Sequence, residues 1–232
     1  MQVSPPDKRR QRMMVAQIAE TKRLVLAVER ALAKNPATLL VTSAVACEGK
    51  SLLAAALATA GAALGDRRVL AIDLNWYRPT LHEFFGVAPT HSLETILDAE
   101  LADLVKGAAT AEEPDLICAP ADHDQIGTRR VNGPELARRL ISASRAAYDL
   151  VVVDSASVFP INRMMMDPVM LASLVDGVAV AVLGGSTPRH EVKRAYKTIE
   201  TAGTPIIGAI VNHRQAPAGD VGAGRGTHRK AG

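Results

Sequence analysis

The feature that most constrains the fold of this chain is a series of six short, almost continuously apolar runs. They cover residues 37–44, 68–74, 115–121, 148–156, 176–184 and 205–212. Strands with this pattern are buried on both faces, as in a parallel sheet covered by helices. Segments with the length and periodicity of helices lie before and between them, at residues 13–34, 50–64, 92–106, 133–147, 167–174 and 188–202. The alternation predicts an α/β fold with a mostly parallel sheet and helices on both faces.

Length and composition are typical of a single globular domain. The chain has 232 residues, of which 48% are hydrophobic and 22% are charged,. No apolar run reaches the roughly 18 residues of a membrane-spanning helix, so we expect none. The two cysteines, Cys47 and Cys118, form neither a disulfide framework nor a metal-binding pattern,. A reducing, cytoplasmic location is therefore the simplest expectation.

The positive charge of the chain is concentrated at its two ends. Residues 1–14 and 214–232 each carry a net charge of +3, so the overall +3 leaves about −3 for the rest. We predict a flexible basic N-terminus over 1–14, a folded domain over 15–214 and a disordered basic tail over 215–232. Basic ends contact an anionic membrane face or an acidic partner, or are simply solvated.

The stretch TSAVACEGKS, at residues 42–51, has the pattern of a phosphate-binding loop running into a helix. Backbone N–H groups and a helix N-terminus attract phosphate in such a loop. Lys50 is placed to reach the terminal phosphates, and the Ser51 hydroxyl is placed to bind Mg²⁺. Ala44, however, stands where the strict pattern has its first glycine. The expected nucleotide contacts are Ala46, Cys47, Glu48, Gly49, Lys50, Ser51 and Leu52.

Two aspartates come at the ends of buried runs, Asp73 in RVLAID and Asp154 in YDLVVVD. A carboxylate buried without a partner is costly, and a neighbouring metal ion or lysine would explain its presence. A capping role is the alternative for Asp73. The candidate metal ligands are Ser51, Asp73 and Asp154, with Asp154 acting through water. The candidate catalytic residues are Lys50, Asp73 and Asp154.

These stretches resemble the bacterial tyrosine autokinases, P-loop ATPases of capsule and exopolysaccharide export. The family's loop commonly reads S-A-x-P-G-E-G-K-S-T, so Ala44 belongs to the deviant Walker A form that partition ATPases also have. Residues 68–86 resemble a second family motif, and 148–158 a third. The matching positions of the second motif are Asp73, Arg78, Pro79, Leu81, His82, Phe85 and Gly86. The resemblance implies that residues 15–214 form a P-loop nucleotide-binding domain.

The resemblance implies ATP and Mg²⁺ as cofactors and phosphoryl transfer to tyrosine. Residues 176–214 correspond to the family's closing section and imply that Asn212 contacts adenine, although a turn residue is equally typical there. The implied partner is a membrane-spanning export adaptor whose cytoplasmic tail completes the site. The expected location is thus cytoplasmic, peripheral at the inner membrane through this partner. Nucleic acid is not expected as a partner.

The resemblance also implies self-association into a homo-oligomer through an E-x-x-R-x-x-R motif in the N-terminal helix. Glu20 and Arg23 match this motif, while Leu26 stands at the last arginine position. A solvated Glu–Arg pair three residues apart on a helix is the alternative, and it leaves the oligomer open.

The chain departs from the family at several functional positions. Cys47 replaces a glycine, at a cost of roughly 1–2 kcal/mol if the position requires positive φ. Leu52 replaces a hydroxyl residue that reaches the α-phosphate, and Asn75 replaces an acid with an amide that cannot act as a base. The C-terminal tyrosine cluster is absent, since the tyrosines are Tyr77, Tyr148 and Tyr196.

These departures leave three functions open. The first is a kinase of this family with reduced activity. The second is a scaffold of the polysaccharide machinery that nucleotide controls without phosphoryl transfer. The third is a positioning ATPase of the chromosome-partition or septum-placement type, although its additional loop lysine is missing from residues 43–47.

Overall fold

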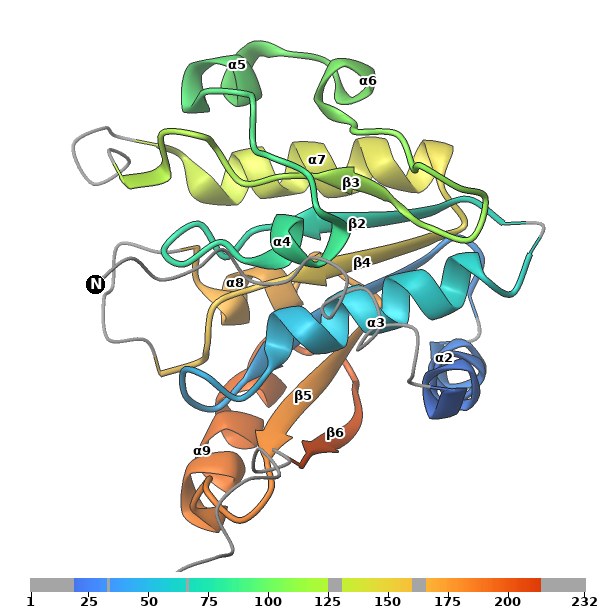
Figure 1. Cartoon of the computed structure of the whole chain (residues 1–232). Coiled ribbons are helices and arrows are strands. Elements are labelled where there is room, and N and C mark those ends of the chain that lie inside the picture. Colours follow the sequence, from blue (N-terminus) through green and yellow to red (C-terminus); the bar gives the residue numbers. More distant parts are fainter. Residues whose placement is uncertain (1–18, 33, 66, 125–130, 160–165, 214–232) are drawn as a thin grey trace, which may run out of the picture.

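The structure, a computed structural model, describes residues 19–213 apart from 33, 66, 125–130 and 160–165. Within this part, six parallel strands form one sheet in the order β3-β2-β4-β1-β5-β6 (Figure 1). The strands are β1 (Ala37–Ser43), β2 (Val69–Asp73), β3 (Asp115–Ile117), β4 (Leu150–Asp154), β5 (Gly177–Leu183) and β6 (Ile206–Asn212). The predicted parallel α/β sheet is confirmed. The predictions for residues 1–14 and 215–232 lie outside the described residues.

Helices cover both faces of the sheet, as predicted (Figure 1). One face carries α2 (Ala19–Leu32), α3 (Lys50–Ala62) and α4 (Leu81–Phe85). The other carries α5 (Leu93–Asp98), α6 (Leu101–Leu104), α7 (Gly133–Ala147), α8 (Pro168–Ala172) and α9 (Arg189–Glu200). A hydrophobic core lies on each face of the sheet. Successive residues of a strand contribute alternately to the two cores, because side chains alternate across a strand. Leu39 and Val41 face the first core, and Leu40 faces the second.

Helix α3 lies close against the middle of the sheet. Its sequence, KSLLAAALATAGA, is rich in alanine, which has the highest helix propensity and the smallest side chain that still packs,. A Cβ at Gly61 would come within 2.8 Å of Leu150 Cδ2, so glycine permits the close approach here. The small side chains thus hold the first turn of α3 firmly at the end of β1, where the phosphate-binding loop is expected.

The predicted helix over residues 92–106 is instead two short helices, α5 and α6. Ala99 and Glu100 between them are extended, with ψ of 152° and 158°. The guanidinium of Arg139 in α7 donates to the carbonyl oxygens of Ile96 and Ala99. Those carbonyls would otherwise continue the helix, so a partner from another element ends it. Two further differences are that α4 was not predicted and that β3 stops at Ile117 rather than at residue 121.

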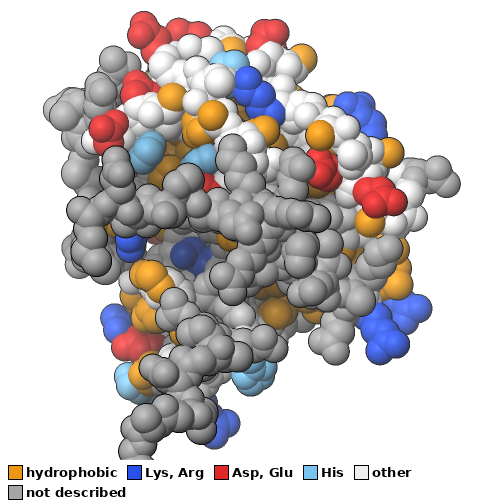
Figure 2. All heavy atoms as spheres, viewed as in Figure 1, with side chains coloured by type: hydrophobic (Ala, Val, Ile, Leu, Met, Phe, Trp, Pro, Cys, Tyr) orange, Lys and Arg blue, Asp and Glu red, His pale blue; other side chains and the backbone are white. Residues whose placement is uncertain are grey.

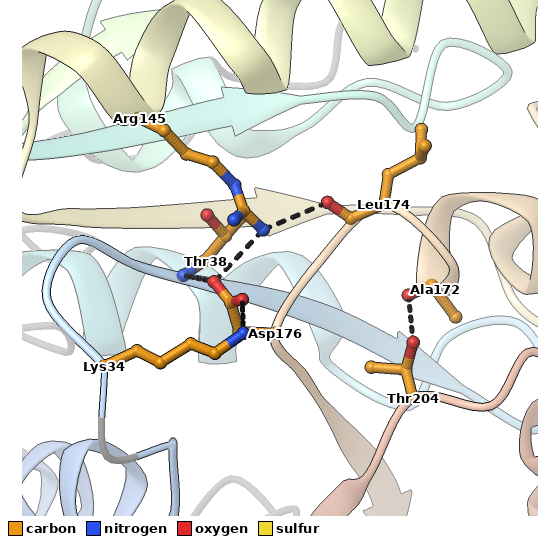
Figure 3. Close-up of polar contacts among 7 residues, drawn as sticks. All are labelled: Lys34, Thr38, Arg145, Ala172, Leu174, Asp176 and Thr204. Atoms are coloured by element: carbon orange, nitrogen blue, oxygen red, sulfur yellow. Dashed lines mark hydrogen bonds and ion pairs between the residues drawn. The ribbon is translucent and has the colours of Figure 1, made fainter.

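A buried carboxylate joins several elements at the amino edge of the sheet (Figure 3). Asp176 Oδ1 lies 2.7 Å from Lys34 Nζ, and Oδ2 accepts the Thr38 N–H at 2.9 Å. Oδ2 also lies 3.1 Å from Arg145 Nη2. Burial raises the pKa of Asp176, but the contacts to Lys34, Thr38 and Arg145 outweigh it and hold the pKa below its usual value. This cluster is structural, and it lies at the edge opposite the phosphate-binding loop.

Candidate nucleotide-binding site

The turn from β1 to α3 has the backbone of an anion-binding loop. Cys47 has φ of 65° and Gly49 has φ of 89°, so both lie in the left-handed region. The Leu53 N–H donates to the Gly49 carbonyl at 2.9 Å. The N–H groups of residues 50–52 therefore have no partner within the helix, and they point outward at its N-terminus. Strain was predicted at Cys47 on the condition that this position has positive φ. The structure shows that it does.

A cleft of about 750 Å³ opens beside this loop. The loop and first turn of α3 contribute Ala46, Cys47, Gly49, Lys50, Ser51 and Leu52 to its wall. The other wall consists of Asn75, Tyr77, Arg78, Thr80, Phe84 and Ser157, from the segments after β2 and β4. Lys50 is 9% exposed and has no ion pair among the described residues. An ammonium group that is buried and unpaired in a cleft is suited to an anionic ligand.

Two carboxylates lie side by side behind the cleft. Asp73 and Asp154 end neighbouring strands in direct register, and both are fully buried. Asp73 accepts the N–H groups of Asn75 at 3.0 Å and Leu81 at 3.2 Å. Neither oxygen of Asp154 has a hydrogen-bond partner in the described part of the chain. The capping alternative for Asp73 is partly realised, since Leu81 opens α4.

The electrostatics of this pair are suited to a cation. Burial raises the pKa of Asp154 more than the nearby Ser51 hydroxyl and Lys50 ammonium lower it, and the resulting pKa is about 6. Burial and the neighbouring Asp154 raise the pKa of Asp73 well above its usual value. The described residues contain no cluster of three or more His, Cys, Asp or Glu that would hold a metal alone. The donor set fits Mg²⁺, which binds through one or two protein oxygens together with phosphate and water.

Two of the residues predicted to contact nucleotide lie behind the loop, outside the cleft wall. Glu48 is 1% exposed, and Asn212 ends β6. The Asn212 side-chain amide donates to the Glu48 carbonyl oxygen at 3.1 Å. A Cβ at Gly49 would come within 2.3 Å of Asn212 Nδ2, and the φ of 89° there also favours glycine. The contact between Asn212 and adenine remains a prediction.

The sequence did not identify several residues of the site. Tyr77, Arg78, Thr80, Phe84 and Ser157 line the cleft, while Leu183 and Thr187 hold the side chain of Glu48. All of them follow, or end, a strand at the carboxyl edge of the sheet. Ligands of parallel α/β folds bind at that edge. This rule is the signal by which the sequence could have identified these residues.

Charges of both signs are mixed over the described part of the face in Figure 2. Acidic side chains lie beside Lys and Arg there, so the described part of this face forms no continuous basic surface. No helix among residues 19–213 that the structure describes is long and apolar enough to cross a membrane.

Comparison with known proteins identifies relatives along most of the chain, although no sequence model of a protein family matches it. Tyrosine-protein kinase YwqD of Bacillus subtilis is 25% identical over 178 residues, which are 77% of this chain and 73% of YwqD. The succinoglycan biosynthesis transport protein ExoP of Rhizobium meliloti is 30% identical over 175 residues, 74% of this chain and 22% of ExoP. The kinase domain of Escherichia coli tyrosine kinase ETK aligns with a TM-score of 0.63 at 25% identity, covering 81% of this chain and 72% of that domain.

Proposed function

Because the chain belongs to the family of bacterial tyrosine kinases, we propose that it binds ATP with Mg²⁺ and transfers a phosphoryl group to protein tyrosine. The process it serves is capsule or exopolysaccharide production, as the names of its relatives support. One observation carries the proposal: an unpaired Lys50 ammonium and an unpaired Asp154 carboxylate flank the same helix N-terminus. A triphosphate with its cation supplies partners for both charges.

The predicted catalytic and metal-binding residues each have a role in phosphoryl transfer, which depends mainly on positioning and on neutralising charge. The first-turn amides of α3 and the Lys50 ammonium hold phosphate oxygens. Ser51 and Asp154 would hold Mg²⁺, which would offset the phosphate charge. Asp73, fixed by the N–H groups of Asn75 and Leu81, orients the metal or the attacking group.

A specific observation supports a second candidate, a nucleotide-controlled scaffold that transfers phosphate poorly. Asn75 lines the cleft at the position of the family's second acid, and its amide donates to the Arg78 carbonyl at 3.1 Å. An amide cannot accept a proton from a tyrosine hydroxyl. Leu52, which also lines the cleft, offers no hydroxyl to phosphate. Both changes lower the capacity of the site for phosphoryl transfer, and both leave Lys50 and the loop amides that would bind phosphate in place.

The proposed partner is a membrane-spanning export adaptor whose cytoplasmic tail completes the site. The likeness to ExoP, a transport protein of which the matched segment is 22%, supports it. Self-association through α2 is a further proposal. Glu20 and Arg23 both lie in α2, with the side chain of Arg23 exposed and that of Leu26 45% exposed.

The test compares the wild-type chain with Lys50→Ala, and uses Lys197→Ala on the exposed face of α9 as the matched control. Calorimetry measures Mg–ATP binding, and turnover and phosphotyrosine are measured with and without the adaptor tail. We expect Lys50→Ala to lose binding and phosphotyrosine and Lys197→Ala to keep both. ATP binding by the wild type without phosphotyrosine in any condition would select the scaffold. A folded wild-type protein that binds no Mg–ATP would refute both candidates.

A further inference from the structure

Glu48 is buried behind the phosphate-binding loop and, through its side chain and its backbone carbonyl, joins the loop to three distant segments. Its Oε2 accepts the Val45 N–H at 2.8 Å, within the loop. Its Oε1 accepts the Leu183 N–H at 3.2 Å and the hydroxyl hydrogen of Thr187. The backbone carbonyl of Glu48 accepts the amide of Asn212 at 3.1 Å. One loop residue therefore contacts the end of β5, the turn that leads to α9, and the end of β6.

The chemistry of this contact requires a carboxylate. Every partner of the Glu48 side chain is a donor, and a carboxylate is the only side-chain group that accepts on both of its oxygens without donating. No Lys, Arg or His of the described chain forms an ion pair with Glu48. Glutamine would turn its NH₂ group toward either the Val45 or the Leu183 N–H. Aspartate would be one methylene too short to reach both.

We infer that Glu48 is a positioning residue, which sets the shape of the phosphate-binding loop by fixing it to the β5–α9 turn. This inference rests on the proposed function. The Val45 N–H is engaged by Glu48, and the chain then reverses through the left-handed residues Cys47 and Gly49. The loop can only relax by giving up the bond to Val45 or the bonds to Leu183 and Thr187. The carboxylate thus holds the first turn of α3 open toward the cleft without touching the ligand.

The nucleotide test uses Glu48→Gln, Thr187→Val and the conservative Thr187→Ser, with Glu191→Gln on α9 as the control. Calorimetry gives the affinity for Mg–ATP and for AMP, which lacks the β- and γ-phosphates. We expect Glu48→Gln to bind Mg–ATP about tenfold or more weakly, since a hydrogen bond to a charged group is lost and a donor is left unpaired. Thr187→Val is expected to lose less, and Thr187→Ser and Glu191→Gln to match the wild type. AMP affinity is expected to stay unchanged.

A second measurement needs no nucleotide. Amide hydrogen exchange of ligand-free protein, read by NMR at Val45 and Leu183, is expected to be slow in the wild type and in Thr187→Ser, and faster at both positions in Glu48→Gln. If the wild type bound no Mg–ATP, the proposed function would fail, and the exchange rates would still decide whether Glu48 holds the loop. Unchanged exchange in Glu48→Gln would overturn the inference. An equal loss of ATP and AMP affinity would also overturn it, because it would indicate a general structural defect.

Discussion

Cys47 is where the backbone of the phosphate-binding loop is strained. It is the one non-glycine residue with positive φ in the described part of the chain, at 65°. A Cβ in the left-handed region costs roughly 1–2 kcal/mol, part of which glycine returns through its larger unfolded-state entropy. We therefore expect Cys47→Gly to raise the free energy of unfolding by up to about 1 kcal/mol, measured by urea denaturation. Cys47→Ala keeps the Cβ and should show no gain; equal stability of the two variants would contradict this account.

The buried carboxyl of Asp154 lowers the stability of the protein when it is ionised. A carboxyl whose pKa is about 6 in the folded state binds its proton more tightly there than in the unfolded chain. Its contribution to stability is complete below about pH 4, the usual pKa, and is lost as pH rises through about 6. We expect Asp154→Asn to raise the free energy of unfolding by about 1–3 kcal/mol at pH 8, where the unpaired buried charge is removed.

The gain from Asp154→Asn should shrink at pH 5, where the wild-type carboxyl is largely protonated. Urea titrations at the two pH values measure this, with Glu112→Gln in the exposed loop before β3 as the control for charge removal. A gain that is the same at both pH values would show that the charge of Asp154 is not its source.

At the scale of elements, Asp176 connects the start of β5 to β1, to α7 and to Lys34 in the segment between α2 and β1. Its side chain is 2% exposed, while its partners Lys34 and Arg145 are 60% and 32% exposed. Removing one charge from a buried cluster is costly, and the exposure of the partners reduces the cost. We expect Asp176→Asn to lower the free energy of unfolding by about 2 kcal/mol at pH 7. Glu191→Gln, which breaks an exposed pair with Arg194 on α9, should change it by less than about 0.5 kcal/mol.

The Asp176 effect has a defined pH dependence. The folded-state pKa lies below the usual value, so the stabilisation is present above about pH 4 and is lost as pH falls below it,. Denaturation curves of wild type and Asp176→Asn should therefore converge in acid. Curves that stayed parallel down to pH 2 would show that packing, and not the charge of Asp176, is responsible.

The elements that the sequence predicted well are those whose pattern is local. Continuous apolar runs located all six strands, because burial on both faces leaves a strong signal in each run. The break between α5 and α6 was missed because its cause is Arg139, some forty residues away in the chain. Helix α4 has five residues, which is too short for its periodicity to stand out.

The same distinction applies to the site. Lys50, Ser51 and the two aspartates were identified because a loop at a strand end and acids after buried runs are local patterns. The partners of Glu48 could not be identified from the sequence, since Leu183 and Thr187 lie about 135 residues further along the chain. The wall formed by Tyr77, Arg78 and Phe84 depends on how the segment after β2 turns, which its sequence does not specify.

For the whole molecule, the cleft is assembled from segments that follow β1, β2 and β4, so a bound nucleotide would tie them together. A ligand that binds only the folded state stabilises it by about 2.7 kcal/mol at a hundredfold excess over its dissociation constant. For a domain of this size we expect Mg–ATP to raise the melting temperature by about 5–10 °C. Scanning calorimetry of wild type and Lys50→Ala checks this. The same shift in Lys50→Ala would place the ligand elsewhere on the protein.

The contacts of Glu48 also bear on how the protein is made. Residue 48 is translated before its partners Leu183, Thr187 and Asn212, which lie 135, 139 and 164 residues further along the chain. The phosphate-binding loop thus lacks the groups that brace it until β5 and β6 have been translated. A nascent chain that ended before β5 would carry the complete GKS sequence without the groups that fix the Glu48 carboxylate.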